Sequence, residues 1–212
     1  MNLRTIWTHF LRWRRPAAPP PGWGAYAVNP RRLTRQWREG RWAYMGGLPE
    51  LARYSLIGGY IQYYHPHARV LDVGCGEGLL AQRLGPGGYV RYLGLDIAPT
   101  AVDQATAKQL PEASFQCADV ESFTTEERFD VIVLNEVLYY FIDPIPVLER
   151  LAGLLAPGGH FVGSMVVNER TAANWQLLER RFTFLDETTA KSGGAEHPWA
   201  VRVWSAEEPR VR

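Results

Sequence analysis

The chain has 212 residues, of which 46% are hydrophobic and 21% are charged, so it fits one folded domain with a substantial core and excludes wholesale disorder. Its 23 basic and 22 acidic residues nearly cancel, and no apolar run reaches the roughly 18 residues of a membrane span, so neither a nucleic-acid-binding nor a membrane-spanning protein is expected. Two cysteines provide neither a disulfide framework nor a zinc cluster, and we expect a cytoplasmic protein without a metal.

The charge is unevenly distributed along the chain. Residues 1–41 contain nine arginines and one acid, whereas the remainder has an excess of acids. Residues 1–15 have the spacing of a basic amphipathic helix, and the sequence PAAPPP at 16–21 predicts a stiff linker. We therefore interpret residues 1–30 as a basic arm with a Pro-rich linker. In the simpler interpretation, this arm is a frayed tail or packs on its own domain. In the other interpretation, it contacts an anionic membrane or a partner.

Two helices are predicted next, over residues 31–47 and 50–64. Glycines and a proline break the first. The second ends before Pro66, because the residue before a proline disfavours the helical conformation. We interpret residues 31–64 as an N-terminal helical cap and residues 65–212 as the main domain.

From residue 65 onward, short apolar strands alternate with helices, and a hairpin follows. The predicted strands are 69–73, 89–95, 113–117, 129–134, 160–166, 182–190 and 199–204. The predicted helices are 79–84, 99–110, 144–155 and 168–181. This alternation predicts a doubly wound α/β sheet, and strands that are apolar throughout predict a sheet covered on both faces. The closing hairpin predicts an antiparallel edge.

Glycines and an acid lie at the carboxyl end of the first predicted strand, where open α/β sheets bind ligands. The strand leads into Gly74-Cys75-Gly76-Glu77-Gly78. This G-x-G-x-G spacing differs from the dinucleotide-binding fingerprint, because the position that would hold the third glycine is Leu79. Asp72 precedes the glycines, where a carboxylate repels a pyrophosphate but holds an ammonium group through hydrogen bonds or water.

Acids also end the second and third predicted strands. Asp96 is placed to accept hydrogen bonds from two ribose hydroxyls, and Asp119 is placed to accept one from an adenine amine. Ile97 and Val120 follow these acids and are placed to sandwich the adenine. A site for an amine, a ribose and an adenine, without a phosphate binder, fits S-adenosylmethionine better than a nicotinamide dinucleotide.

Five segments together resemble the class I S-adenosylmethionine-dependent methyltransferases. They are VLDVGCGEG (70–78), GLDIA (94–98), CADVESF (117–123), FDVIVLNEVLYYF (129–141) and LLAPGGHFVGS (154–164). The resemblance covers about residues 65–205. It implies a Rossmann-like sheet of seven strands, mostly parallel with an antiparallel C-terminal strand and flanked by helices. It also implies S-adenosylmethionine as cofactor and S-adenosylhomocysteine as product.

The resemblance also implies a role for individual residues. Gly74, Cys75 and Gly76 correspond to the loop that packs on the methionine part of the cofactor. The two acids at the ends of the second and third strands keep their ribose and adenine roles. Asn135, after the fourth strand, corresponds to the residue whose backbone carbonyl accepts from the methionine amine.

A narrower resemblance concerns two segments. Residues 135–140 are similar to the nodulation-type N-methyltransferases, which act on a sugar amine. Residues 42–60 resemble small bacterial methyltransferases found with glycan or natural-product genes. In that group, aromatic and arginine side chains close over the cofactor. By position these side chains are Trp42, Tyr44 and Arg53, and Arg53 is able to pair with the methionine carboxylate. The alternative is that the aromatic pair belongs to the core.

Glu136 and Tyr140 are the candidate catalytic residues. An amine must be neutral to attack, so the Glu136 carboxylate is placed to orient it and take its proton; the alternative is a surface carboxylate at a helix start. Tyr140 and its neighbour Tyr139 either line the pocket, where they shield or contact a sulfonium, or belong to the core. Cys75 is interpreted as a packing residue, because no base or cation lies near it in the sequence.

The predicted function is transfer of a methyl group from S-adenosylmethionine to a small-molecule acceptor by direct displacement. Aminosugars, glycans and natural-product intermediates are the expected acceptors, and the lack of a clear histidine base favours nitrogen over oxygen. A nicotinamide oxidoreductase is opposed by the glycine spacing. A DNA amino-methyltransferase is opposed by the missing Asn/Asp-Pro-Pro-Tyr motif and the acidic body. A non-catalytic cofactor-binding scaffold or a membrane-associated assembly factor remains the alternative.

Overall fold

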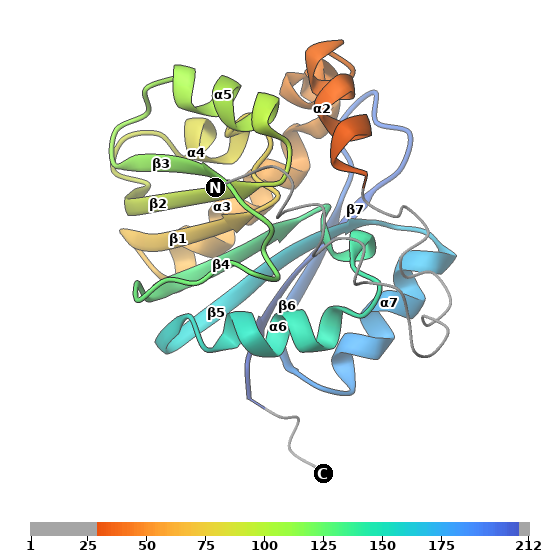
Figure 1. The fold of residues 1–212 in the computed structure, drawn as a ribbon. Helices are drawn as coiled ribbons and strands as arrows, with labels where there is room; N and C mark the ends of the chain where they lie inside the picture. The colour runs from red at the N-terminus through yellow and green to blue at the C-terminus, as the bar shows by residue number, and fades with distance from the viewer. Residues whose placement is uncertain (1–28, 208–212) are drawn as a thin grey trace.

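The computed structural model describes residues 29–207, in which one twisted sheet carries helices on both faces (Figure 1). The predicted amphipathic arm and the proline-rich linker lie outside the described residues. No helix in residues 29–207 is long and apolar enough to cross a membrane.

The sheet built by residues 29–207 has seven strands in the order β3-β2-β1-β4-β5-β7-β6. The strands are β1 (Ala68–Val73), β2 (Tyr89–Asp96), β3 (Ala113–Cys117), β4 (Phe129–Asn135), β5 (Leu155–Val166), β6 (Thr183–Ala190) and β7 (Trp199–Ser205). Neighbouring strands from β3 to β5 pair in parallel, and β7 pairs antiparallel with both β5 and β6. The predicted fold class is therefore confirmed, including the antiparallel C-terminal strand.

The helices and turns connect these strands in the expected alternation. The α-helices are α2 (Pro30–Arg38), α3 (Leu51–Tyr64), α4 (Leu79–Leu84), α5 (Pro99–Ala107), α6 (Pro144–Ala152) and α7 (Glu169–Glu179). The 3₁₀ turns are η1 (Ala43–Gly46), η2 (Leu48–Glu50) and η3 (Leu138–Tyr140).

The core lies on both faces of the sheet. On one face, Leu71 of β1 packs in a cluster with Leu148 of α6 and Trp175 of α7. On the other, Val70 of β1 packs in a cluster with Ile57 of α3. Adjacent residues of a strand point to opposite faces, so a strand covered on both sides is apolar throughout, as its sequence indicated.

The prediction of one helix over 31–47 is wrong, because α2 ends at Arg38. Gly40 follows with φ +68°, a left-handed conformation that glycine adopts without steric cost and that commonly ends a helix. The chain then forms two 3₁₀ turns before α3 begins at Leu51. Another boundary also differs: β5 begins at Leu155, earlier than the predicted 160–166, because the preceding helix closes at Ala152.

The strand order reverses direction between β1 and β4, so the connections after these strands leave in opposite directions at their carboxyl ends. Open α/β sheets form their ligand crevice at such a switch point. The fold therefore places the loops after β1, β2, β3 and β4 at one common edge.

At the opposite end of the sheet, two histidines pair. His65 Nε2 lies 2.7 Å from His160 Nδ1, and Tyr64 packs against His160 with ring centroids 5.0 Å apart. One ring must donate and the other accept, so at least one of the two is neutral. Burial lowers the pKa of both imidazoles; the nearby Asp130 opposes this for His65, and His65 lowers the pKa of His160 further.

Acidification is therefore expected to weaken the fold through this pair. The unfolded histidines bind protons first as pH falls through about 6.5, so stability is lost below that pH and levels off only at the lower folded-state values. We expect His160→Gln to reduce the fall in Tm between about pH 7.5 and about pH 5.5 by about 2–4 °C. Thermal unfolding followed by circular dichroism measures this.

The matched control is His197→Gln, which changes an exposed histidine of the β6–β7 loop. The comparison separates the effect of the His65–His160 pair from the effect of replacing any one histidine. The pH dependence of each variant is compared with that of wild type because a carboxyl group with a raised pKa, such as Asp72, instead makes the fold more stable as pH falls. Equal pH dependence in His160→Gln and wild type would show that the pair contributes nothing.

Candidate active site

A cavity of about 550 Å³ lies at the carboxyl ends of the central strands. It is bounded by the loops after β1 to β4, by α2 and the turns η1 and η2, and by α3. All of the residues predicted to bind cofactor or to catalyse line this one cavity: Trp42, Tyr44, Arg53, Asp72, Gly74, Cys75, Gly76, Asp96, Ile97, Asp119, Val120, Asn135, Glu136 and Tyr140. The structure thus brings together residues spread over about a hundred positions of sequence.

The glycine loop turns sharply after β1 and is held against β2. Gly74 and Gly76 have φ values of +76° and +54°. A Cβ on Gly74 would lie 2.9 Å from Val137, and one on Gly76 would lie 3.0 Å from the Trp37 ring. The amides of Gly74 and Cys75 donate to the Leu95 carbonyl at 2.7 and 3.0 Å. Glycine is therefore required at both positions by conformation and by space.

Asp96 anchors the loop and faces the cavity. Its Oδ2 accepts from the Gly76 amide at 2.9 Å, and its Oδ1 accepts from the Ala98 amide at 2.8 Å. Each oxygen of a carboxylate accepts more than one hydrogen bond, so both oxygens keep capacity for a ligand. Burial raises the pKa of Asp96, and the backbone donors oppose that rise.

Asp119 presents an unused acceptor. Its Oδ1 accepts from the Glu121 amide at 3.0 Å, whereas its Oδ2 is buried without a hydrogen-bond partner among residues 29–207. A buried carboxylate oxygen in this position suits a donor such as an amino group. Ile97 and Val120 line the cavity beside the two acids, as expected for apolar residues flanking a flat ring.

Cys75 is buried in the loop. Burial raises the pKa of its thiol well above the ordinary value, and the nearby Asp96 and Asp72 add to the rise. A thiol in such surroundings stays protonated and is a poor nucleophile. These surroundings support the interpretation of Cys75 as a packing residue.

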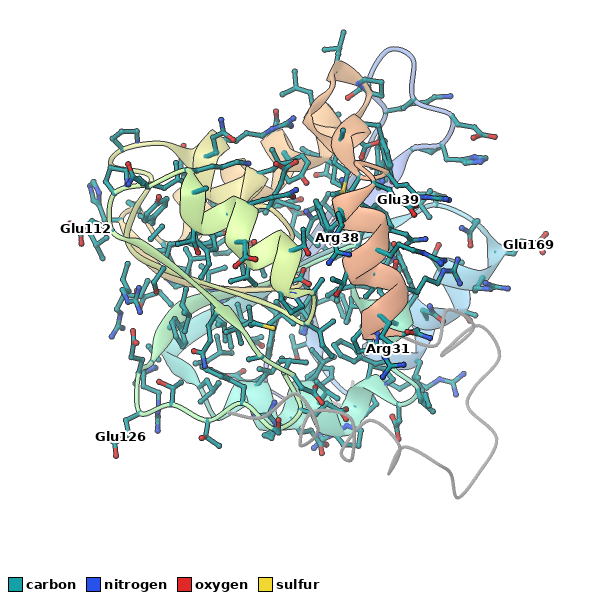
Figure 2. The ribbon with its side chains drawn as sticks, turned by 45° about the horizontal axis from the view of Figure 1, so that its top comes forward. Arg31, Arg38, Glu39, Glu112, Glu126 and Glu169 are labelled. Atoms are coloured by element: carbon teal, nitrogen blue, oxygen red, sulfur yellow. The ribbon has the colours of Figure 1, made fainter. Side chains whose placement is uncertain are left out.

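Aromatic side chains from the N-terminal segment form one wall of the cavity. The ring centroids of Trp37 and Trp42 lie 6.0 Å apart, and those of Trp42 and Tyr44 lie 6.3 Å apart. Trp42 Nε1 is buried and lacks a hydrogen-bond partner among the described residues. Figure 2 shows that α2, which carries Trp37, crosses this part of the molecule with Arg31 and Arg38 near its two ends.

Arg53 of α3 is almost fully buried and is paired. Its Nη2 donates to Glu50 at 2.8 Å, and its guanidinium lies 4.8 Å from the Tyr54 ring centroid and 5.5 Å from that of Trp199. Arg53 Nε has no hydrogen-bond partner within residues 29–207. A ligand carboxylate that reached Arg53 would therefore share it with Glu50.

Glu136 directly follows β4 and folds into the cavity wall. Its carboxylate accepts hydrogen bonds from Ser164 Oγ at 3.0 Å, Tyr139 OH at 3.2 Å and the Val166 amide at 3.3 Å. The residue has φ +58°, an unusual conformation for a residue with a side chain. Burial raises the pKa of Glu136, and Arg53 is the largest opposing cause. The alternative of a solvated surface carboxylate is therefore wrong.

Two further predicted residues lie beside Glu136. Asn135 Oδ1 accepts from Ser164 Oγ at 2.8 Å, so the serine hydroxyl lies between Asn135 and Glu136. Tyr140 lines the cavity and packs against Tyr139 with ring centroids 4.9 Å apart. Both tyrosines line the cavity, which agrees with the pocket-wall alternative of the sequence analysis.

Sequence reasoning missed several cavity residues. Trp37 and Trp199 had no motif to mark them, because they reach the site through α2 and the first residue of β7. Glu50 looked like an ordinary residue at a helix start. Glu121 follows the acid at the end of β3, and burial together with Asp119 raises its pKa to about 8.

A family model described as a methyltransferase domain matches residues 33–192. The match covers well over half of the chain, and it includes the glycine loop and the acids at the strand ends. The chain therefore belongs to the class I S-adenosylmethionine-dependent methyltransferases, and S-adenosylmethionine is its cofactor.

Curated relatives include a ubiquinone biosynthesis O-methyltransferase of Coxiella burnetii (strain Dugway 5J108-111), 30% identical over 142 residues, or 64% of this chain and 60% of the relative. Nodulation protein S of Rhizobium tropici is 38% identical over 102 residues, or 46% of this chain and 42% of that protein. The matched part of the chain thus spans about three fifths or less of the length of these relatives.

Among solved structures, N-methyltransferase NodS from Bradyrhizobium japonicum WM9, in complex with S-adenosylhomocysteine, superposes with a TM-score of 0.69. The two proteins are 23% identical, and the match covers 82% of this chain and 96% of NodS. At this level of identity the likeness concerns the fold.

Proposed function

We propose that this protein methylates an amine nitrogen of a small-molecule acceptor, such as an aminosugar, a glycan or a natural-product intermediate. The observation that carries the proposal is the fixed carboxylate of Glu136 in the wall of the cavity. The names of the relatives give weaker support, since NodS is called an N-methyltransferase whereas the ubiquinone relative is called an O-methyltransferase.

The buried acids suit the parts of the cofactor. We propose that Asp72 and the carbonyl of Asn135 hold its ammonium group, that Asp96 holds the ribose hydroxyls, and that Asp119 Oδ2 accepts from the adenine amine. Within the part of the chain that the structure describes, Asp72 Oδ1 and Asp119 Oδ2 are buried without a hydrogen-bond donor, which supports these roles because such a ligand provides one. When bound, S-adenosylmethionine supplies a methyl group on a sulfonium, which is already an activated leaving group.

The N-terminal segment completes this arrangement. The cap proposed over residues 31–64 contributes Trp42 and Tyr44 to one wall of the cavity and Arg53 to its interior. We propose that Arg53 pairs with the carboxylate of the methionine part. The aromatic wall excludes water, and holding reactants in line in a dry site contributes roughly 7–11 kcal/mol to lowering the barrier.

The charge of the cavity wall around Glu136 favours an amine as the acceptor. Glu50 is neutralised by Arg53 in a buried ion pair, whereas neutral hydroxyl and amide donors fix Glu136. The wall around Glu136 therefore carries a net negative charge, which attracts a cationic amine. A carboxylate with a raised pKa takes up a proton more readily, so Glu136 can accept the proton that the amine must lose. Tyr140, beside it, is proposed to shield the reacting sulfur and nitrogen from water.

The test is a panel of acceptors in matched pairs, each an amine and its hydroxyl analogue, such as glucosamine with glucose. Purified protein is incubated with S-adenosylmethionine, and products are identified by mass spectrometry with fragmentation to place the methyl group. We expect methylation of amine members only. Methylation confined to hydroxyl oxygens would overturn the amine assignment while leaving the methyltransferase class intact.

A further inference from the structure

A tyrosine outside the recognised motifs contacts the acid that precedes the glycine loop. Tyr92 of β2 donates a hydrogen bond from its hydroxyl to Asp72 Oδ2 at 2.5 Å. Both side chains are buried, with 0% of Tyr92 and 2% of Asp72 exposed. β1 and β2 pair in parallel, with Val70 opposite Tyr92 and Asp72 opposite Gly94. Tyr92 and Asp72 therefore lie diagonally on the same face of the sheet.

The second oxygen of the same carboxylate is unused. Asp72 Oδ1 is buried and has no hydrogen-bond partner within the part of the chain that the structure describes, and Asp72 lines the cavity. One oxygen is thus held by Tyr92 while the other remains to accept from a donor. A buried carboxylate with one unused oxygen matches a ligand that brings both a donor and a positive charge.

Among residues 29–207, the surroundings of the pair provide no such donor. The titratable and charged groups around it are Asp96 at the end of β2, Cys75 in the glycine loop and Tyr54 of α3, with Arg53, Arg83 and Glu50 around Tyr54. Arg53 donates to Glu50, and Arg83 donates to the carbonyls of Met45 and Gly46. The charged group that shifts the pKa of Asp72 is another acid, Asp96, which makes the negative charge of Asp72 harder to maintain.

We propose that Tyr92 is a positioning residue for the cofactor: its hydroxyl fixes the Asp72 carboxylate and directs Oδ1 toward the ammonium group of the bound ligand. The inference rests on the role proposed above for Asp72 toward the ammonium group, but it concerns cofactor binding alone and requires no acceptor. Its outcome is therefore separate from that of the amine proposal.

The proposal has a consequence for pH dependence. Burial raises the pKa of Asp72 to about 7, the hydrogen bond from Tyr92 opposes this rise, and Asp96 adds to it. Only the ionised carboxylate attracts an ammonium group, so affinity should fall by up to about tenfold for each pH unit below about 7. The pKa of Tyr92 is itself raised well above the ordinary value, so its hydroxyl remains a donor throughout this range.

The experiment is calorimetric titration of the full chain with S-adenosylhomocysteine between about pH 5.5 and about pH 8.5. We expect Tyr92→Phe to move the midpoint of the affinity curve upward by about one pH unit, which weakens binding about five- to tenfold at pH 7. Most of the affinity should return near pH 8.5, where the carboxylate is ionised and lacks only the positioning by Tyr92. Asp72→Asn should bind weakly, with this pH step removed. Wild-type protein near pH 7 should also release protons on binding, seen as a dependence of the heat on the buffer.

Two controls isolate the pair. Tyr89→Phe removes a hydroxyl from the same strand, where the Tyr89 ring lies 5.1 Å from Tyr92, and should reproduce the wild-type curve. The ligand 5′-methylthioadenosine shares the adenosine but lacks the ammonium, so its affinity should be the same for wild type and Tyr92→Phe. These comparisons also separate Asp72 from Glu121 and Glu136, which titrate in the same cavity.

Two results would overturn the proposal. One is an unchanged midpoint in Tyr92→Phe. The other is a loss of affinity that is equal at every pH and extends to 5′-methylthioadenosine, since a general packing defect produces that pattern. Thermal unfolding of each variant shows whether the fold is retained.

Discussion

Replacing Asp96 with alanine is expected to weaken S-adenosylhomocysteine binding by at least about a hundredfold. The carboxylate has capacity for two ribose hydroxyls, and hydrogen bonds to a charged group contribute roughly 1.5–3 kcal/mol each. The substitution also removes the acceptor of the Gly76 and Ala98 amides, so the glycine loop loses the side chain that fixes its position. Calorimetric titration of wild type and Asp96→Ala measures the effect.

The matched control is Asp103→Ala, which removes an exposed carboxylate from α5, the helix that begins just after Asp96. It should bind the ligand as wild type does. Asp96→Asn separates the anchoring of the glycine loop from the binding of the ribose, because an amide keeps one oxygen for backbone donors but loses the charge. Wild-type affinity in Asp96→Ala would show that the ribose is bound elsewhere.

Glu136→Gln is expected to lower turnover by about a hundredfold or more while leaving the affinity for S-adenosylhomocysteine within about twofold. Glutamine has nearly the same shape and keeps one oxygen for Ser164, Tyr139 or Val166. It cannot take a proton from an amine, however, and it removes the net negative charge of this wall. Initial rates with an acceptor from the amine panel, together with calorimetry, measure both quantities.

The pH profile provides a second readout for the same substitution. Because the pKa of Glu136 is raised by burial, wild-type turnover should fall as pH drops through that value, and Glu136→Gln should lack this step. Glu126→Gln is the control, since Glu126 is exposed at the margin of the molecule (Figure 2) and precedes β4, whereas Glu136 follows the other end of that strand. Equal rates in Glu136→Gln and wild type would remove Glu136 from the mechanism.

The acids and glycines of the cavity are predictable from sequence because each lies at or just beyond the carboxyl end of a strand. A strand that is buried on both faces is apolar, so Asp96 and Asp119 are conspicuous where the strands end, and the topology then brings those ends together. The glycines are conspicuous for the same reason, as a sharp turn there requires them.

Residues that reach the site from within a strand, or through the packing of turns and hairpins, are not predictable in this way. Tyr92 lies inside an apolar strand and resembles any core aromatic until β1 places Asp72 beside it. Glu50 and Trp199 depend on how the N-terminal turns and the C-terminal hairpin pack, which strand and helix periodicity does not encode. The early end of α2 had a local sign in Gly40, but the 3₁₀ turns that follow depend on tertiary packing.

The contact between Trp37 and the glycine loop joins two parts of the chain that are far apart in sequence. Trp37 and Leu33 of α2 line the same cavity as the loop, and Trp37 packs against Ala98 and Ala101. A ligand that touches α2 and the strand ends together binds more weakly when α2 detaches. Thermodynamic reciprocity then requires that the same ligand hold α2 in place by an equal free energy. Backbone amides of α2 should therefore exchange hydrogen more slowly when the cavity is filled, which makes this helix an internal reporter of occupancy.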